Sequence, residues 1–176
     1  MIPDVRDSLP PPSLMPDRTY TLPELRYPEH LNVGEALLDA NADGDHGGRV
    51  AIQAGERHLS YAELAKQVNR LCHGLRSAGL DTGDRVLLRM PNVPEFIVTW
   101  LACQKLGIVT VGTMPMLRAR ELAYIAEDAG TKTAVVWGDL RDELERAQHR
   151  HRADRHDAEL LAGEPRHDEL GDVGHA

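Results

Sequence analysis

Three short apolar runs, separated by segments of helix length, constrain the fold of this chain more than any other feature. The runs are VLLRM (86–90), IVTVG (108–112) and TAVVW (133–137), and they are rich in β-branched residues. Continuous apolar runs of this length are typical of strands that are buried on both faces. Because strands that alternate with helices pair in parallel through right-handed crossovers, the pattern predicts an α/β fold with a short parallel βαβαβ sheet flanked by helices.

The two intervening helices are recognised from their termini and their spacing. Pro94 begins the first helix, at a position where its missing N–H costs little, and Gly107 ends it. The second helix is expected over 118–129, because its apolar residues recur with helical spacing. These residues are Leu122, Ile125, Ala126 and Ala129.

Ahead of this unit, the sequence predicts a short helix, a β-hairpin and a longer helix. Asn32 is the expected cap of the short helix over 31–40, and two alternating runs around the turn at 54–56 predict the hairpin. Ser60 and Glu63 have the spacing of a capping box, in which each satisfies a backbone N–H at the helix start. The longer helix carries one apolar stripe and then a glycine stop: Leu64, Val68, Leu71, Cys72, Leu75 and Gly79.

The two cysteines, Cys72 and Cys103, lie 31 positions apart along the chain. Neither has a second cysteine close by, so the CxxC spacing of redox and zinc sites is absent. Because each cysteine lies within an apolar helical pattern, we expect both to be plain buried thiols.

Several segments together resemble the front of the large N-terminal domain of the AMP-forming adenylating enzymes, which include acyl-CoA synthetases, peptide-synthetase adenylation domains and luciferases. LSYAEL (59–64) resembles the first core motif of that family, GDRV (83–86) follows at the expected distance, and 91–130 is similar to the second core motif and the helix beyond. Within the family, 14–39 and 113–122 resemble the benzoate and 2-aminobenzoate CoA ligases. The resemblance implies a partial N-terminal domain of an AMP-forming acyl-CoA synthetase.

The reaction that this resemblance implies is ATP-dependent ligation of a small carboxylic acid to CoA. The carboxylate and ATP give an acyl-adenylate and pyrophosphate, and CoA then captures the acyl group and releases AMP, with ATP, Mg2+ and CoA as cofactors. The family binds ATP phosphates on a Ser/Thr/Gly-rich loop that ends in Lys, where backbone N–H groups and the lysine offset phosphate charge. This chain has four serines in all and no such loop. We therefore assign no catalytic residue and expect the chain alone to be inactive and to bind these cofactors poorly.

Arg118 is the one candidate binding residue, for a phosphate of CoA. It follows Pro115 in a segment that, in some CoA ligases, lies near the CoA nucleotide and carries a basic residue. Met116 occupies the usual basic position here, and Arg120 is a second arginine nearby. An arginine at a helix N-terminus can hold a phosphate. The alternative is that Arg118 is an ordinary solvated arginine.

Two further groups of polar residues have a chemical and a simpler interpretation. His149, His151 and His156 include the HxH spacing of a metal site, but no apolar shell accompanies them, so we interpret them as a polar tract and assign no metal ligand. Four acids near the end of the family-like part are interpreted as a solvated helix face rather than as a carboxylate pair. They are Asp139, Asp142, Glu143 and Glu145.

Composition divides the chain into three parts. Residues 1–30 are Pro-rich and aperiodic and predict an extended arm, 31–147 form the partial AMP-binding domain, and 148–176 contain five of the nine histidines and little apolar periodicity. The last part resembles a GC-rich reading frame translated out of register. A truncated or frameshifted ligase gene product is therefore our hypothesis for the whole chain.

Charge and hydropathy exclude several other classes of protein. The net charge of −8 argues against a surface for nucleic acid. The acidic, Pro-rich start lacks the features of a secretory signal, and no apolar stretch reaches the roughly 20 residues of a membrane span. We therefore expect a cytoplasmic protein that binds neither nucleic acid nor membrane.

Three hypotheses follow, and they leave open whether the chain is an enzyme. The first is the N-terminal fragment of an acid–CoA ligase, inactive alone, with an aryl acid such as benzoate or 2-aminobenzoate as the substrate of the whole enzyme. The second is a non-catalytic α/β binding module that docks on a partner such as a full-length ligase. The third is a complete small enzyme, which is disfavoured because no nucleophile, base and orienting residue can be assembled from the sequence.

Overall fold

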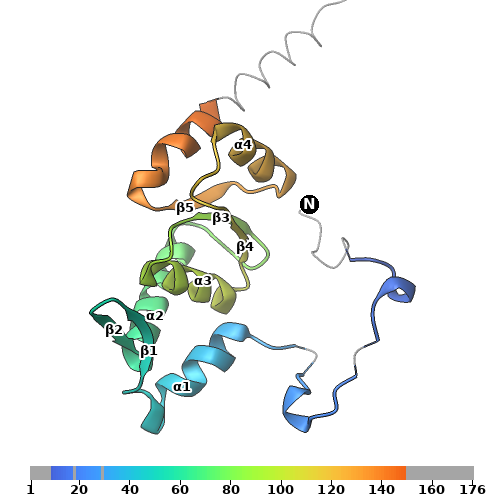
Figure 1. Ribbon diagram of the computed structural model, residues 1–176, viewed down its shortest axis with the longest axis vertical. Coiled ribbons are helices and arrows are strands. Elements are labelled where there is room, and N and C mark those ends of the chain that lie inside the picture. Colours follow the sequence, from blue (N-terminus) through green and yellow to red (C-terminus); the bar gives the residue numbers. More distant parts are fainter. Residues whose placement is uncertain (1–8, 18, 29, 150–176) are drawn as a thin grey trace, which may run out of the picture.

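The computed structural model describes residues 9–17, 19–28 and 30–149. They form an α/β body with a sheet in the middle layer and helices on both of its faces, together with a separate β-hairpin and an extended N-terminal segment (Figure 1). The predicted α/β class is confirmed.

The sheet consists of three parallel strands in the order β4-β3-β5, namely β3 (Arg85–Arg89), β4 (Val109–Gly112) and β5 (Thr133–Val136). In the register, Leu87 pairs with Val111 on one side and with Ala134 on the other. The βαβαβ prediction is confirmed, and each strand starts or ends within one residue of the predicted run.

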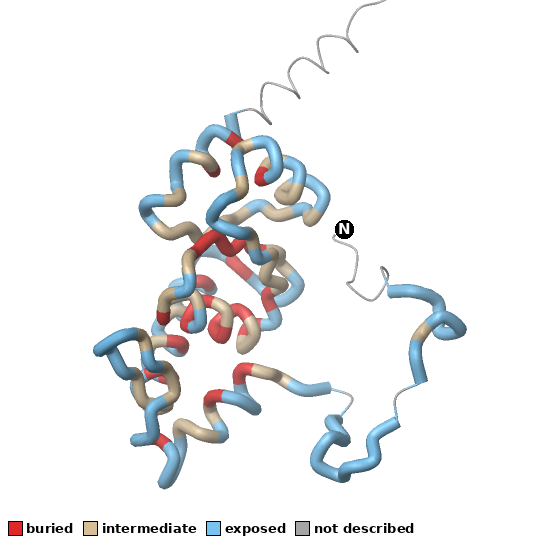
Figure 2. The backbone as a smooth tube through the Cα atoms, viewed as in Figure 1, coloured by how far each residue is buried: buried red, intermediate tan, exposed pale blue. Residues whose placement is uncertain are grey.

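Helices α2 (Tyr61–Ser77) and α3 (Pro94–Leu106) cover one face of this sheet (Figures 1 and 2). Val86 of β3 belongs to the core that these helices form, and alternate positions of the strand point to the opposite face. Burial on both faces explains why the strand is apolar without alternation. The buried core on this side contains Leu38, Leu64, Ala65, Val68, Cys72, Leu75, Leu80, Val86, Val98, Leu101, Ala102, Cys103, Leu106 and Ile108.

Helix α4 (Ala119–Asp128) and a helical segment over 141–149 lie on the other face, above the sheet in Figure 1. Leu122, Leu144 and Ala147 are the buried residues of this layer. The predicted helix over 118–129 is confirmed. The segment 141–149 is not only a solvated face, because its leucine and alanine contribute to the packing.

The hairpin and the start of α2 form as predicted. Strands β1 (Val50–Ala54) and β2 (Arg57–Ser60) are antiparallel. Ser60 caps α2: its hydroxyl accepts a hydrogen bond of 3.3 Å from the backbone N–H of Glu63, and its own N–H donates to the Glu63 carboxylate at 2.9 Å. The capping box therefore accounts for both side chains without a role in chemistry.

The short N-terminal helix differs from an ordinary α-helix. Its middle, Glu35–Asp39, is π-helical and is followed by α1 (Ala40–Ala42). The predicted cap is confirmed, since the Asn32 side chain accepts a hydrogen bond of 3.2 Å from the N–H of Glu35. Lys105 of α3 holds this helix in place, with its ammonium group 2.8 Å from the Asp39 carboxylate.

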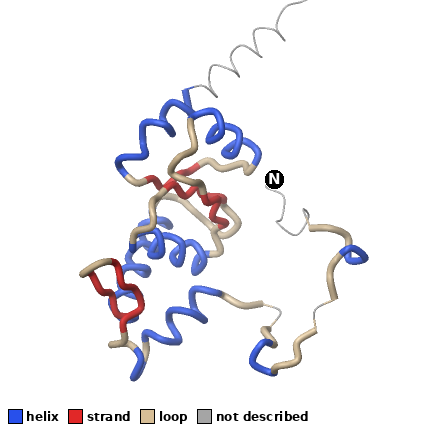
Figure 3. Tube along the Cα trace, in the orientation of Figure 1, coloured by secondary structure: helices blue, strands red, loops and turns tan. Residues whose placement is uncertain are grey.

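The described residues of the arm contain two single 3-10 turns, Pro12–Leu14 and Pro23–Leu25, and the other described positions from 9 to 28 are loop (Figure 3). Between 9 and 28 none of the described residues is buried (Figure 2). The predicted tail over 148–176 lies outside the described residues except for Gln148 and His149.

Candidate functional site

The carboxyl ends of parallel strands are where α/β proteins bind ligands, because loops from neighbouring strands diverge there. Three loops of this chain meet at that edge of the sheet, after β3, β4 and β5. The backbone N–H of Trp137 donates to the carbonyl of Arg89 at 2.9 Å, and the backbone N–H of Thr113 donates to the carbonyl of Leu88 at 3.0 Å. The two outer loops are thus tied to the end of the central strand.

Arg89, the last residue of β3, is the most unusual side chain at this edge, because it is charged and only 1% exposed. Its Nη1 donates to the carbonyl of Met114 at 2.8 Å, and its Nη2 donates to Pro115 at 2.8 Å and to Leu117 at 2.9 Å. Its Nε donates to the carbonyl of Leu140 at 3.3 Å, in the turn after β5. Burial lowers the pKa of the Arg89 guanidinium, yet an arginine stays protonated in proteins.

The loop after β4 turns its carbonyl groups inward to Arg89 and carries exposed methionines. Met114 is 62% exposed and Met116 is 77% exposed. A large apolar side chain in water is unremarkable alone, but here two occur within three residues at the carboxyl ends of the strands. The loop therefore exposes two apolar side chains, while its backbone carbonyls are bound by the buried Arg89.

Arg118 follows this loop and stands at the N-terminus of α4, as the sequence predicted. Its side chain is 78% exposed, and its Nη1 lies 3.4 Å from the Glu143 carboxylate. Its backbone N–H donates to the Glu121 carboxylate at 3.0 Å, which is one of the two hydrogen bonds of a capping box. The other bond, from the backbone N–H of Glu121 to the Arg118 side chain, cannot form because a guanidinium has no acceptor. The structure therefore pairs the predicted phosphate-binding residue with an acidic side chain of its own chain.

Glu143 corrects the interpretation of the acids near the end of the family-like part. Rather than lying on a solvated face, it accepts a hydrogen bond of 3.0 Å from the N–H of Ala119 in the first turn of α4. Its carboxylate also lies 3.0 Å from Arg146. Partial burial opposes ionisation of Glu143, but the Ala119 hydrogen bond and the two arginines outweigh it and lower its pKa.

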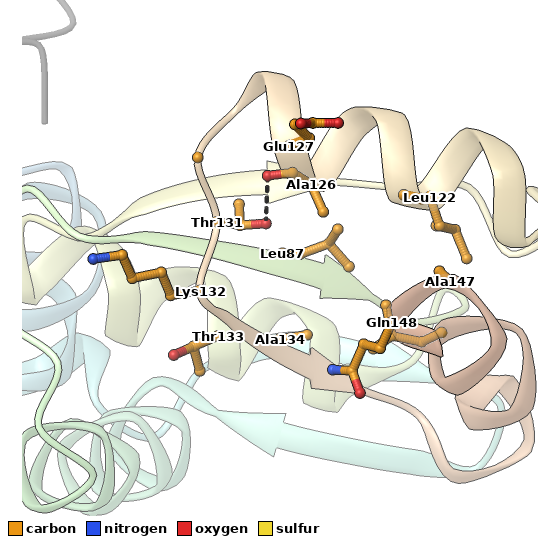
Figure 4. A pocket seen from close by; sticks show the side chains of 13 residues that line it. Leu87, Leu122, Ala126, Glu127, Thr131, Lys132, Thr133, Ala134, Ala147 and Gln148 are labelled. Carbon is orange, nitrogen blue, oxygen red and sulfur yellow. Dashed lines mark hydrogen bonds between the residues drawn. The ribbon is translucent and has the colours of Figure 1, made fainter. Parts of the chain in front are cut away.

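A hollow of about 420 Å3 lies between α4 and the segment 141–149, on the same face of the sheet (Figure 4). Its apolar wall includes Leu87, Leu122 and Ala147, and Thr131 donates its hydroxyl hydrogen to the carbonyl of Ala126 at 3.3 Å. The hollow lies beside the start of β5 and not at the carboxyl ends of the strands. It has the size of a ligand site, but no set of converging charged groups accompanies it.

The buried cysteines have the character that the sequence predicted. Cys72 and Cys103 are free thiols and both are buried. Burial raises the pKa of Cys72, and burial together with the nearby Cys72 raises the pKa of Cys103 to about 11. A thiol with a raised pKa is a poor nucleophile at neutral pH, so neither cysteine is a candidate for covalent chemistry.

The described residues do not provide a metal centre. Within 9–17, 19–28 and 30–149, no group of three or more His, Cys, Asp and Glu side chains could hold a metal ion. Of the predicted alternatives, His151 and His156 lie outside the described residues. The described helices also lack the combination of length and apolarity that a membrane span requires.

Solved structures share this fold. A benzoate CoA ligase from Burkholderia xenovorans LB400 superposes with a TM-score of 0.63 at 22% identity, over 68% of this chain and 24% of that chain. The N-terminal subdomain of Klebsiella oxytoca NpsA, in complex with 3-hydroxybenzoyl-AMSN, superposes with a TM-score of 0.56 at 27% identity, over 60% and 26% of the two chains. The fold is that of part of the N-terminal subdomain of adenylate-forming enzymes.

The sequence comparison agrees with this class. The family model described as AMP-binding enzyme matches residues 38–172, and the chain belongs to this family. The match includes most of 148–176, for which the out-of-register origin stays a hypothesis.

Curated relatives show how much of the family this chain represents. A 2,3-dihydroxybenzoate-AMP ligase of Bacillus subtilis is 34% identical over 58% of this chain and 19% of its own length. An acetyl-coenzyme A synthetase of Mycolicibacterium smegmatis is 36% identical over 60% of this chain and 12% of its own length. The chain therefore spans about a fifth or less of the length of these two relatives.

Proposed function

We propose that this chain is the opening α/β unit of an ATP-dependent acid–CoA ligase. In the proposed reaction, a carboxylate oxygen attacks the α-phosphate of ATP, pyrophosphate leaves, and the CoA thiol then displaces AMP from the acyl-adenylate. The observation that carries the proposal is the family match over 38–172 on a βαβαβ unit with the fold of adenylate-forming enzymes. Because the reaction consumes ATP and CoA, the proposal includes a cytoplasmic location.

We further propose that the chain alone does not catalyse this reaction. The sequence contains no Gly-rich loop followed by Lys, so it offers no cradle for the ATP phosphates. The residues of a Mg2+ site are not found either, since the described acidic side chains form no cluster of three or more with metal-binding geometry.

An aryl acid is the proposed substrate of the complete enzyme. This is supported by the resemblance of 14–39 and 113–122 to aryl-CoA ligases, and by neighbours whose names specify benzoate and 2,3-dihydroxybenzoate. The acetyl-coenzyme A synthetases among the relatives make acetate the competing substrate.

A pyrophosphate-release assay tests the proposed reaction and the inactivity of the chain. The purified chain is incubated with ATP, Mg2+ and either benzoate, 2-aminobenzoate or acetate, and a complete aryl-CoA ligase serves as the positive control. We expect pyrophosphate from the control only. Acid-dependent pyrophosphate release by the chain itself would contradict the proposed inactivity and would identify the acid.

Arg118 is proposed to contact a phosphate of CoA. Its exposure at the start of α4 supports this role, whereas its contact with Glu143 competes with it. A phosphate would therefore displace a carboxylate that already neutralises part of the charge, and binding to the isolated chain is expected to be weak.

Calorimetric titration with CoA and with dephospho-CoA tests the Arg118 contact. We expect Glu143→Gln to strengthen the binding of CoA, because the competing charge is removed, and Arg118→Met to weaken it. Arg120→Met is the matched control, since Arg120 is an exposed arginine on the same helix. Equal affinities for wild type and Arg118→Met would exclude the contact.

The alternative function is a binding module that docks on a partner such as a full-length ligase. One observation favours it: among the described residues, β5 pairs only with β3, so its other edge is open to a further strand. Binding of the purified chain to a full-length ligase, without turnover, would support this alternative. A purified chain that does not bind the ligase would favour the incomplete ligase.

The origin of 148–176 has its own test. Translating the other two reading frames of the gene after codon 148 should reveal a Gly-rich loop ending in Lys in one of them. If neither frame encodes such a loop, the frameshift hypothesis is wrong.

A further inference from the structure

Arg89 is a buried charge whose hydrogen bonds go to backbone carbonyls. Within the described part of the chain, its guanidinium donates to four of them, three of which belong to the loop that follows β4. Removing a charge from water is costly unless its hydrogen-bonding groups are satisfied. A methionine or leucine would fill the same volume between the sheet and α4 at a lower cost. The presence of an arginine therefore requires a reason other than packing.

The geometry of the guanidinium supplies that reason. Arginine presents five N–H donors in a rigid planar fork, whereas lysine is a compact point charge. Here one nitrogen contacts Met114, and the neighbouring nitrogen contacts both Pro115 and Leu117. Three carbonyls within four residues can face one point only in a restricted set of backbone conformations. The fork thereby selects one conformation of the loop.

We propose that Arg89 is a positioning residue that fixes the loop Thr113–Arg118 at the ligand-binding edge of the sheet. The loop then presents Met114 and Met116 outward, followed by Arg118 at the start of α4. A role of this surface in ligand binding rests on the proposed function. The positioning of the loop by Arg89 is independent of the proposed function.

Without the guanidinium, the loop and not the core is expected to rearrange. The carbonyl of Met114 accepts from Arg89 and also from the N–H of Leu117, at 3.2 Å. Once the fork is removed, the three loop carbonyls lose their buried donor and have to turn toward water. The core under α2 and α3 contacts the opposite face of the sheet, so it is expected to keep its packing.

Amide hydrogen exchange of the free chain tests this directly. In Arg89→Met, we expect the amides of Thr113 and Leu117 to exchange about tenfold faster or more than in wild type, the size expected from losing charged hydrogen bonds. The amides of Val68 and Cys72 in α2 should keep their protection. Arg120→Met is the matched control, because it removes an exposed arginine beside the loop without touching it.

Arg89→Lys separates the fork from the charge. Because lysine has a single nitrogen in place of the Nε, Nη1 and Nη2 that contact the carbonyls, it cannot occupy all of their positions, and we expect Arg89→Lys to exchange as fast at Leu117 as Arg89→Met. Wild-type protection in Arg89→Lys would overturn the proposal. An increase of equal size at Val68 and Cys72 would also overturn it, since it would show that Arg89 stabilises the fold as a whole.

A measurement on the wild-type chain covers the case in which the variants do not fold. NMR of arginine side chains should show one guanidinium with slowly exchanging Nε and Nη protons and hindered rotation, assigned to Arg89. A freely rotating Arg89 guanidinium would overturn the proposal. No ligand is present in either experiment, so a failure of the proposed function leaves both results interpretable.

Discussion

The carboxylate of Glu143 accepts a hydrogen bond of 3.0 Å from the backbone N–H of Ala119, 24 positions earlier in the chain. A helix N-terminus has N–H groups without intrahelical partners and a partial positive charge. The segment 141–149 thus supplies a cap for α4 from outside that helix. It also neutralises part of the charge of Arg118, at 3.4 Å.

Glu143→Gln should make stability less dependent on pH in the acid range. The pKa of Glu143 is lowered in the folded state from its ordinary value of 4.5. Its contribution is therefore present above pH 4.5 and is lost as the pH falls through the folded-state pKa. Urea unfolding from pH 7 to pH 3 should show a smaller loss of stability for Glu143→Gln than for wild type, and a lower stability at pH 7. An equal loss of unfolding free energy between pH 7 and pH 3 in both proteins would contradict the stabilising role of the Glu143 carboxylate.

Lys105→Met should detach the N-terminal helix from α3. The Lys105 ammonium group contacts Asp39 at 2.8 Å and Asn69 at 2.7 Å, and its side chain is only 16% exposed. Losing these bonds is expected to cost about 1–3 kcal/mol of unfolding free energy, because Asp39 is left partly buried without its partner. Urea denaturation measures the loss, and limited proteolysis should cut near residue 40. The control is Lys66→Met, at an exposed position of α2, with a change below about 0.5 kcal/mol.

Alanine at two glycines should have effects of opposite sign. Gly107 ends α3 with φ +69°, and a Cβ there would lie 2.8 Å from Thr82 Cγ2, so Gly107→Ala is expected to destabilise the chain by about 1 kcal/mol or more. Gly74 lies inside α2 with open space around its Cα. Gly74→Ala should therefore stabilise the chain by about 0.5–1 kcal/mol. Thermal unfolding of the two variants measures both, and equal shifts would contradict the assignment.

Cys103 should react with thiol reagents only after the chain opens. Its thiol is buried, and burial raises its pKa to about 11, so the thiolate is scarce at pH 8. We expect the rate of labelling by an aromatic disulfide to follow the unfolding equilibrium as urea is added. Fast labelling of Cys103 in native buffer would show that the Cys103 face of α3 is not buried in the core.

Much of the fold could be predicted because its signals are local. The capping box of Ser60 and Glu63, the proline that begins α3 and the glycine that ends it all act within a few residues. The apolar runs at 86–90, 108–112 and 133–137 likewise predict strands, because a strand buried on both faces needs apolar residues throughout.

The site was less accessible to the same reasoning. Arg118 could be predicted because it lies in the segment 113–122, which resembles aryl-CoA ligases. Arg89 is a single charged residue within the apolar run 86–90. The signal in the sequence was the arginine itself, because a strand that is buried on both faces has no solvent for a charged side chain. The N–H donors of such an arginine must be satisfied inside the protein. Which carbonyls satisfy it could not be inferred.

Contiguous residues were enough to predict the order of helices and strands, the parallel sheet and membership of the adenylating family, since periodicity, caps and motifs are local properties. The place of Arg89 under the loop Thr113–Arg118 and the capping of α4 by Glu143 depend on contacts that form in the folded chain. Both relationships join segments 24 to 28 positions apart. Their energies depend on burial and on distances across the sheet, which exist only after the chain has folded.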